Sequence, residues 1–285
     1  MTYSFMRWAA RQSQKKNTLR SAVNLLSKIR TKVRQGGLTF LRDEDLLEIV
    51  MKNMKKEQSR SHHHYVQELK DNKIIRNQYD LMCKKYKVKK YKSWEHKLDS
   101  FPGNIAVYYG LIRELKPSII VETGTATGSM TSYLLAALNK NNNGRLISLD
   151  LPPVSGKLTM DLTLSNAEVG YWIPDAYKDR WTYLLGDSKI TLPRVMVAEK
   201  VDFFIHDSLH TRSHMLFEYS VARVLMPEGG IIASDDILWN NSYDNFLMIN
   251  GLTGWAPNSN PNIGVTINKF DKFETKIGTG ISSSL

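Results

Sequence analysis

Between residues 101 and 268, short apolar runs alternate with amphipathic helical patterns. The runs lack the polar–apolar alternation of a half-exposed strand, so they predict strands buried on both faces of a parallel sheet. The expected strands are Ile119–Glu122, Arg145–Asp150, Trp181–Leu185, Val201–His206, Gly230–Ser234 and Gly264–Asn268, the last of which follows a stretch rich in Pro and Asn. The expected helices are Ile105–Leu115, Ser129–Leu138, Ile190–Ala198, Ser213–Leu225 and Tyr243–Ile249. This repetition of strand and helix predicts a doubly wound α/β fold.

Upstream of residue 101 the pattern is helical and basic. Apolar residues from Leu19 to Val33 fall on one helical face, and two adjacent glycines end that pattern. A second amphipathic pattern begins after Asp43. His62–His64 is expected to be a loop, because three adjacent histidines cannot all face one metal ion on a regular element. We therefore predict a basic helical extension over residues 1–95 and an α/β domain over residues 96–285.

The net charge of +11 is unevenly distributed along the chain. Residues 1–100 carry 24 Lys and Arg against 10 Asp and Glu, and residues 101–285 carry 15 against 18, so the first part is +14 and the rest is −3. The basic part therefore predicts an association element. Its partner is an anionic membrane surface, another protein, or a nucleic acid held by the alternating Lys and Tyr of Lys84–Lys92. A solvated charged face and an organellar transit peptide are the remaining interpretations.

The chain has one cysteine, Cys83, so no intrachain disulfide can form. No apolar run approaches the roughly 18 residues that a membrane-spanning helix needs. These features favour a reducing, cytoplasmic setting, with the basic extension allowing peripheral contact with a membrane. The sequence leaves open whether the chain forms a homo-oligomer.

A glycine-rich loop follows the first strand predicted in the α/β domain. It runs Glu122-Thr-Gly124-Thr125-Ala-Thr-Gly128-Ser and opens a helix. Glycine permits positive φ and lets a ligand approach the backbone closely, although a plain tight turn also explains such a loop. Two acids strengthen the case for a nucleotide-type cofactor. Asp150 ends the second of these strands, where a carboxylate can bind ribose hydroxyls, and Asp187 with Ser188 follows the third.

The order of these motifs resembles that of class I S-adenosylmethionine-dependent methyltransferases, over roughly residues 100–270. The resemblance implies a Rossmann-like, mostly parallel seven-stranded sheet with helices on both faces. It also implies that Glu122 and Gly124 lie along the methionine part of S-adenosylmethionine, that Asp150 holds its ribose, and that Asp187 with Ser188 reaches its adenine. Ala126 departs from the third glycine that many members carry. NAD is less favoured as the cofactor, because nothing else in the chain indicates hydride chemistry.

Three acids follow the next two strands of the predicted sheet. Asp207 comes directly after one strand, and Asp235 with Asp236 follows its neighbour, so the carboxyl ends of these strands should bring the three together. Converging carboxylates repel unless a cation lies between them, and hard oxygen ligands suit Mg²⁺. An alternative is that Asp235 and Asp236 simply cap a helix. The first interpretation predicts a divalent metal site.

Asp207-Ser-Leu-His210 and Ser-Asp235-Asp236 together resemble the metal-dependent O-methyltransferases of the catechol and macrolide-sugar types. In those enzymes the acids bind the metal, and the residue three positions after the first acid is the proposed base. That residue is a lysine in the catechol type and a histidine in the sugar type, so the resemblance implies that His210 is the base. His206 is expected to be a hydrogen-bonded core or supporting histidine, and His214 to be structural or to pair with a glutamate one turn later.

The favoured function is metal-dependent O-methylation of a hydroxyl group on a sugar, glycolipid or other small natural product. One alternative is a nucleic-acid-binding protein or nucleic-acid methyltransferase that uses the basic extension. It is disfavoured because the chain lacks the Asn-Pro-Pro-Tyr-like or catalytic-cysteine signatures of base methylation. The other alternative is a non-catalytic cofactor-binding scaffold, against which the acids and His210 argue.

Overall fold

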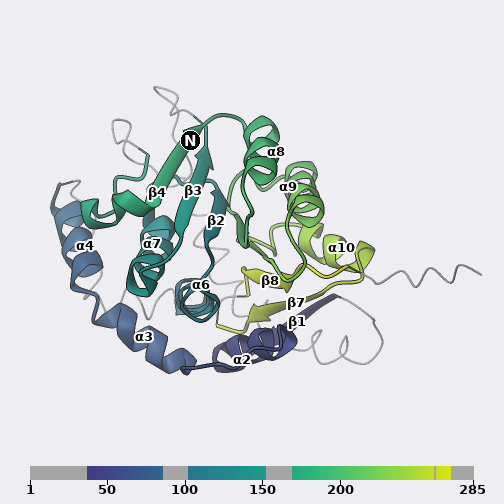
Figure 1. The fold of residues 1–285 in the computed structure, drawn as a ribbon, viewed down its shortest axis with the longest axis horizontal. Helices are drawn as coiled ribbons and strands as arrows, with labels where there is room; N and C mark the ends of the chain where they lie inside the picture. The colour runs from purple at the N-terminus through teal and green to yellow at the C-terminus, as the bar shows by residue number, and fades with distance from the viewer. Residues whose placement is uncertain (1–36, 86–101, 152–168, 260, 271–285) are drawn as a thin grey trace, which may run out of the picture.

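The computed structural model describes residues 37–85, 102–151, 169–259 and 261–270, which form a sheet covered by helices on both faces (Figure 1). The strands are β1 (Gly37–Leu41), β2 (Ile119–Thr123), β3 (Arg145–Asp150), β4 (Trp181–Leu185), β5 (Phe203–His206), β6 (Ile231–Ser234), β7 (Thr253–Pro257) and β8 (Gly264–Ile267). The α-helices are α2 (Asp43–Asn53), α3 (His62–Lys70), α4 (Lys73–Lys85), α6 (Pro102–Leu115), α7 (Ser129–Asn141), α8 (Ser188–Ala198), α9 (Arg212–Leu225) and α10 (Ser242–Ile249). A short 3₁₀ helix, η1, spans Asp175–Arg180.

The eight strands lie in the order β1-β7-β8-β6-β5-β2-β3-β4. All neighbouring pairs are parallel except those made by β8, which runs antiparallel to β6 and β7. From β2 the chain builds outward through β3 to β4, then returns to place β5 on the other side of β2. The carboxyl ends of β2 and β5 therefore flank the topological switch point, where doubly wound sheets bind their ligands.

The sheet separates two hydrophobic clusters. Successive side chains of a strand point to opposite faces, so Ile120 joins the cluster under α2, α3, α4, α6 and α7, and Val121 joins the cluster under α8, α9 and α10. Phe203 and Phe204 divide in the same way on β5. Because both faces are covered, the central strands are apolar without alternation, as the sequence pattern predicts. The doubly wound, mostly parallel α/β fold is confirmed.

The predicted number of strands was wrong, since the sheet has eight strands and not seven. Neither β1 nor β7 was expected. Gly254 of β7 reads as a turn residue, but a Cβ at this position would lie 2.4 Å from Leu247 Cδ1 on α10. The glycine is therefore explained by the close approach of a helix to the sheet. β1 then pairs with β7 in parallel, from Gly37 opposite Thr253 to Leu41 opposite Pro257.

Residues 37–85 share the core of the α/β domain. Leu46, Tyr65 and Tyr79 are buried in the same cluster as residues of α6 and α7, and α2 and α3 pack on α6. The loop prediction for His62–His64 was wrong. These residues begin α3, because Ser61 caps the helix and its Oγ accepts a hydrogen bond of 3.2 Å from the His64 N–H.

Other predictions for the N-terminal part fall outside the described residues. These are the helix predicted over Leu19–Val33, most of the lysine run after Lys85, and the predicted division at residue 95. Among the helices of the described residues, none combines the length and the apolar character that crossing a bilayer requires.

Candidate active site

The glycine-rich loop lies directly against the loop that follows β5. Gly124 has a φ of +86°, and a Cβ there would lie only 2.0 Å from the carbonyl oxygen of Asp207. Gly128, with a φ of +80°, precedes α7, and a Cβ there would lie 2.7 Å from Ile173 Cγ1. Both glycines are therefore required by backbone conformation and by close packing. The same loop brings the ends of β2 and β5 together.

Ala126 explains why the resembled family often has a third glycine in this loop. Its φ is +45°, in the left-handed region that costs a residue with a Cβ roughly 1–2 kcal/mol. The carbonyl oxygen of Ala126 accepts a hydrogen bond of 2.9 Å from Gly170 N–H, which helps to hold this strained turn. The departure from the family pattern thus places a residue with a Cβ in the left-handed region.

Asp150 holds the glycine-rich loop from the end of the neighbouring strand β3. Its Oδ2 accepts hydrogen bonds from the N–H groups of Thr125, at 2.8 Å, and Ala126, at 2.9 Å. Its Oδ1 accepts one from Leu151 N–H at 2.7 Å. The carboxylate lies at the predicted strand end and is partly exposed. Its first structural role is therefore to shape the loop, and the ribose contact stays a prediction.

Glu122 lies in the core, only 2% exposed, and its Oε1 accepts hydrogen bonds from Thr131 Oγ1, at 2.7 Å, and Ser148 Oγ, at 2.6 Å. Ser148 in turn accepts a hydrogen bond of 2.7 Å from Trp181 Nε1. Burial raises the pKa of Glu122 to about 7, even though both hydroxyl donors favour the ionised form. The carboxyl group of Glu122 therefore links the start of the loop to Thr131 on α7 and to Ser148 on β3. Its contact with the methionine part of a cofactor stays a prediction.

Glu122→Gln is expected to flatten the pH dependence of folding stability. The pKa of Glu122 is about 7 in the folded protein, above that of a glutamate in an unfolded chain, about 4.3. Between these values only the folded state keeps the proton, so wild-type stability falls as the pH rises, by on the order of 3 kcal/mol. Urea unfolding at about pH 4 and about pH 8 should show a smaller loss for the variant. Parallel pH profiles would contradict the raised pKa.

Asp187 and Ser188 lie at the end of β4, where α8 begins. Asp187 is exposed, and its side chain caps α8 by accepting a hydrogen bond of 2.9 Å from Lys189 N–H. Ser188 is buried, and its Oγ is 3.0 Å from His214 Nε2. Asp187 is thus exposed at the N-terminus of α8, and its contact with adenine stays a prediction. Ser188 is instead oriented toward the interior.

A buried hydrogen-bond network centred on Glu218 lies at the carboxyl ends of β2 and β5. Both Glu218 and His206 are 0% exposed, and His206 Nδ1 is 2.6 Å from Glu218 Oε2. His214 Nε2 is 2.8 Å from Glu218 Oε1. Burial alone would raise the pKa of Glu218, but the hydrogen bonds from the two histidines hold it well below its usual range. The predictions of a core role for His206 and a structural pair for His214 are confirmed.

His210 lies between two carboxylates at the carboxyl ends of β5 and β6. Its Nε2 is 3.8 Å from Asp207 Oδ1 and 4.0 Å from Asp236 Oδ2. This nitrogen is buried and has no hydrogen-bond partner among the described residues. Burial, followed by the neighbouring His206, lowers the pKa of His210, so its neutral form is favoured. Asn240 holds the segment in place through a hydrogen bond of 3.1 Å from its Nδ2 to the His210 carbonyl oxygen.

The predicted metal ligands do not form a closed site. Over the described ranges, no three His, Cys, Asp or Glu side chains stand close enough to hold a metal ion. Asp236 has a φ of +50° and accepts a hydrogen bond from Asn262. The helix-cap alternative does not hold either, since Asn241 is the N-cap of α10.

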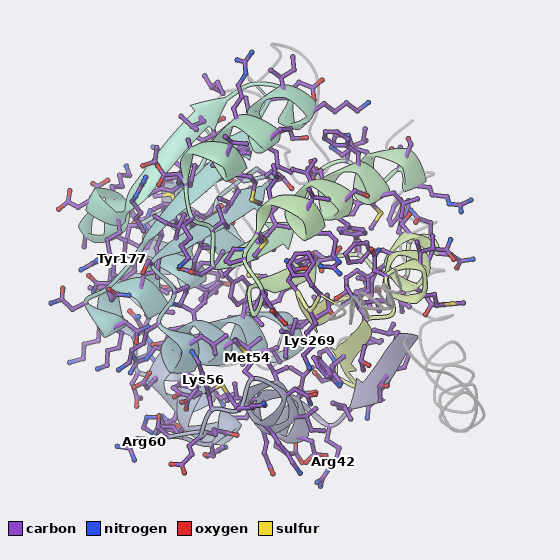
Figure 2. All side chains as sticks on the ribbon, turned by 45° about the vertical axis from the view of Figure 1, so that its right-hand side comes forward. Arg42, Met54, Lys56, Arg60, Tyr177 and Lys269 are labelled. Atoms are coloured by element: carbon purple, nitrogen blue, oxygen red, sulfur yellow. The ribbon has the colours of Figure 1, made fainter. Side chains whose placement is uncertain are left out.

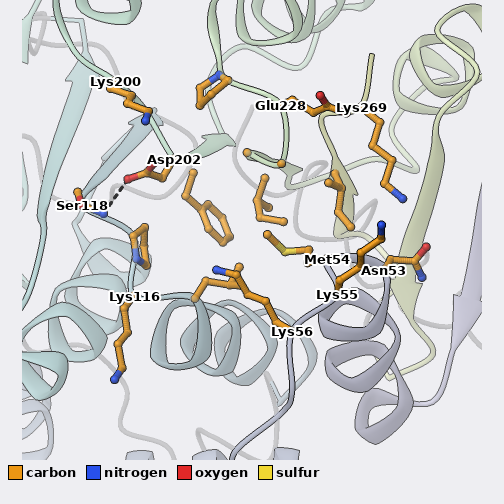
Figure 3. Close-up of a pocket in the computed structure, with 18 residues that line it drawn as sticks. Asn53, Met54, Lys55, Lys56, Lys116, Ser118, Lys200, Asp202, Glu228 and Lys269 are labelled. Atoms are coloured by element: carbon orange, nitrogen blue, oxygen red, sulfur yellow. Dashed lines mark hydrogen bonds between the residues drawn. The ribbon is translucent and has the colours of Figure 1, made fainter. Parts of the chain in front are cut away.

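One cavity of about 590 Å³ lies at the opposite edge of the sheet (Figure 3). Its lining includes Lys55, Lys116, Lys200 and Lys269, and Figure 2 labels Met54, Lys56 and Lys269 in this part of the molecule. The helices α2, α6 and α8 end close to these lysines. Cations near helix C-termini offset the partial negative charge of the helix dipole. The charge of this cavity is therefore explained without a ligand, and none of the predicted site residues lines it.

One family model matches the part of the chain that contains the candidate site. Residues 121–237 match the family model described as a methyltransferase domain. Among curated proteins, none matches the chain.

Several solved structures are similar to the chain at low identity. The O-methyltransferase TomG from Streptomyces achromogenes, in complex with SAM, has 12% identity, a TM-score of 0.48, and coverage of 71% of this chain and 92% of its own. An O-methyltransferase from Bacillus cereus in complex with SAH has 15% identity, a TM-score of 0.43, and coverage of 70% and 96%. The SAH-bound methyltransferase PaMTH1 from Podospora anserina has 12% identity, a TM-score of 0.40, and coverage of 70% and 73%. At this level of similarity they do not indicate an acceptor. The family match covers residues 121–237, so the segment that carries the glycine-rich loop at the switch point is similar to a methyltransferase domain.

Proposed function

We propose that this methyltransferase acts on a hydroxyl group of a sugar, glycolipid or other small natural product, with His210 as the base. The observation that carries the proposal is the buried Nε2 of His210, which has no hydrogen-bond partner among the described residues. It belongs to the segment whose Asp207 and Ser208 lie against Gly124 of the loop expected to hold the cofactor. An alcohol is a weak nucleophile until its proton is removed, so a neutral imidazole at this position supplies the missing function.

Each residue of the candidate site has a separate role in the proposed reaction. When bound, S-adenosylmethionine supplies an electrophilic methyl group on a sulfonium. His210 Nε2 accepts the hydroxyl proton while the oxygen–carbon bond forms and the sulfur–carbon bond breaks. Asp207 and Asp236, within 4.0 Å of that nitrogen, stabilise the imidazolium that results. Asp150, through the loop it holds, and Asp187 are proposed to bind the ribose and the adenine.

The surface beside His210 supports an acceptor with an apolar face. Trp239 is 51% exposed, and its ring centroid is 6.2 Å from that of His210. Leu209 and Leu238 are exposed to 58% and 37% in the same two loops. Aromatic side chains supply a large apolar contact area at low entropic cost. A sugar ring or a lipid-linked glycan can lie on this surface with one hydroxyl near His210.

The metal predicted from the sequence is not part of the proposed steps, because the placed side chains do not form a closed ligand set. Binding of Mg²⁺ by Asp207, Asp235 and Asp236 therefore stays a prediction. The same holds for a membrane surface or a nucleic acid as partner of residues 1–95, which include ranges outside the described residues.

The cofactor part of the proposal is tested by calorimetry of S-adenosylmethionine binding. Asp150→Ala is expected to weaken the affinity by about 10- to 100-fold. The loop N–H groups and the ribose would lose a charged acceptor, and hydrogen bonds to charged groups contribute roughly 1.5–3 kcal/mol. Asp175→Ala is the matched control, because this aspartate is 93% exposed on η1 and should leave the affinity unchanged. Equal affinities for Asp150→Ala and wild type would remove Asp150 from the site.

The acceptor class is tested by methyl transfer from labelled S-adenosylmethionine to glycans, glycolipids, phenols and RNA, with and without a chelator. Transfer to a sugar hydroxyl supports the proposal. Transfer to RNA alone would overturn it in favour of the nucleic-acid alternative. Loss of transfer on chelation, restored by Mg²⁺, would support the metal prediction, and full activity in the chelator would contradict it.

A further inference from the structure

A single carboxylate on α9 joins the two strand ends that carry the site. Glu218 Oε2 accepts hydrogen bonds from Thr123 Oγ1, at 2.6 Å, and from His206 Nδ1, at 2.6 Å. Glu218 Oε1 accepts hydrogen bonds from Ser208 Oγ, at 3.0 Å, and from His214 Nε2, at 2.8 Å. The carboxylate therefore accepts hydrogen bonds from four donors, which lie on β2, β5, the loop after β5 and α9 itself.

The positions of these donors in the chain are informative. Thr123 is the last residue of β2 and precedes Gly124, so it belongs to the start of the cofactor loop. Ser208 lies between Asp207 and His210, so it belongs to the segment that carries the base. His206 ends β5, and its ring lies edge-on to the ring of His210, with centroids 5.3 Å apart. Glu218 thus bridges the cofactor side and the base side of the crevice.

The burial of Glu218 restricts the movement of the groups that it joins. Glu218 is 0% exposed, and its four donors stabilise the ionised carboxylate. A buried charge that loses its hydrogen-bond partners is strongly disfavoured. Moving any one of the four donors away from Glu218 is therefore expected to cost free energy. The surroundings of Gly124 add to this, because the loop already lies against the Asp207 carbonyl oxygen with no room for a Cβ.

We infer that Glu218 is a positioning residue for methyl transfer, which sets the separation between the cofactor loop and His210. The inference rests on the proposed function of His210. Transfer needs the acceptor oxygen close to His210 and in line with the methyl group, and a misplacement of about 1 Å can cost on the order of 10²-fold in rate. Glu218 is not proposed to contact the reacting atoms. It acts through Thr123 on one side and Ser208 on the other.

The competing interpretation is that the network only stabilises the core. The two interpretations differ in which kinetic parameter each donor affects. Removing the hydroxyl of Ser208 should lower kcat at saturating substrates by about 10-fold or more and leave S-adenosylmethionine affinity within about twofold, because only the base side is released. Removing the hydroxyl of Thr123 should weaken S-adenosylmethionine affinity more than it lowers kcat. A core role predicts a loss of stability without this division.

The experiment compares Ser208→Ala, Thr123→Val and Glu218→Gln in the full chain, with Thr266→Val as the matched control. Thr266 is also 0% exposed and donates from its Oγ1 to the Thr253 carbonyl oxygen at 2.8 Å, but it lies on β8, away from the crevice. Thermal unfolding, calorimetry of S-adenosylmethionine binding, and kcat and KM on an acceptor found active with the wild type are measured for each variant. Thr266→Val should lose stability like Thr123→Val while keeping wild-type affinity and kcat.

The expected result is the division between kcat and cofactor affinity, with Glu218→Gln lowering both. If all three network variants lose only stability, as the control does, the positioning role is overturned. If Glu218→Gln fails to fold, Ser208→Ala and Thr123→Val still distinguish the two interpretations, because each removes one hydrogen-bond donor to Glu218. His210→Ala separates the two claims. Wild-type activity in His210→Ala overturns the proposed function, whereas inactive His210→Ala with wild-type kinetics in the network variants overturns only the role of Glu218.

Discussion

His210→Ala is expected to lower kcat by about 10²- to 10⁴-fold, the usual range for loss of a general base. S-adenosylmethionine affinity should stay close to wild type, because His210 Nε2 lies near Asp207 and Asp236 and takes no part in the hydrogen bonds that Asp150 makes to the cofactor loop. Steady-state kinetics at saturating substrates and calorimetry measure the two effects separately. His63→Ala is the matched control, since His63 is exposed on α3. An unchanged kcat in His210→Ala would exclude it as the base.

Gly124→Ala is expected to abolish S-adenosylmethionine binding or to unfold the chain. Two costs add at this position: a φ of +86° and a Cβ only 2.0 Å from the Asp207 carbonyl oxygen. Left-handed backbone alone costs roughly 1–2 kcal/mol for a residue with a Cβ. The clash is with backbone, so it can be relieved only if the loops after β2 and β5 separate.

Gly229→Ala carries only the first of these costs, so its comparison with Gly124→Ala isolates the clash. Gly229 has a φ of +87°, and a Cβ there meets nothing within 4 Å. Thermal unfolding and calorimetry should therefore show a modest loss of stability and intact cofactor binding for Gly229→Ala, against a far larger effect for Gly124→Ala. Equal effects of the two substitutions would mean that the contact between the two loops does not shape the site.

The predicted strands of the α/β domain agree with the structure to within a few residues, because strands buried on both faces leave a continuous apolar signal that needs no knowledge of their partners. β3 and β4 match their predicted bounds. β7 gave no such signal, since its short strand includes Gly254 and Pro257. Its glycine is explained only by the approach of α10. Local pattern therefore found the strands that carry their own hydrophobic signal, and it missed β7, which is shaped by its neighbour, together with β1, which pairs with β7.

The site shows the same division. The sequence placed Asp150, Asp207 and Asp236 at strand ends, and parallel strands bring their carboxyl ends to one edge, so their convergence on the crevice could be expected. The individual contacts could not. Whether a carboxylate faces the crevice or the core depends on the path of the chain around it, and Glu122, which ends in the core beside Ser148, lies only two residues from Gly124.

By itself the sequence determined the class of fold, the positions of the glycine-rich loop and the strand-end acids, and the identity of the histidine three residues after Asp207. Only the tertiary structure decided that His210 lies between Asp207 and Asp236, that the predicted metal ligands remain apart, and that Glu218 ties Thr123 to Ser208. The physical reason is the distance along the chain over which each interaction acts. Periodicity and glycine conformation act over a few neighbouring residues, whereas hydrogen bonds and ion pairs join segments far apart in the chain, such as Thr123 and Glu218, which are 95 residues apart.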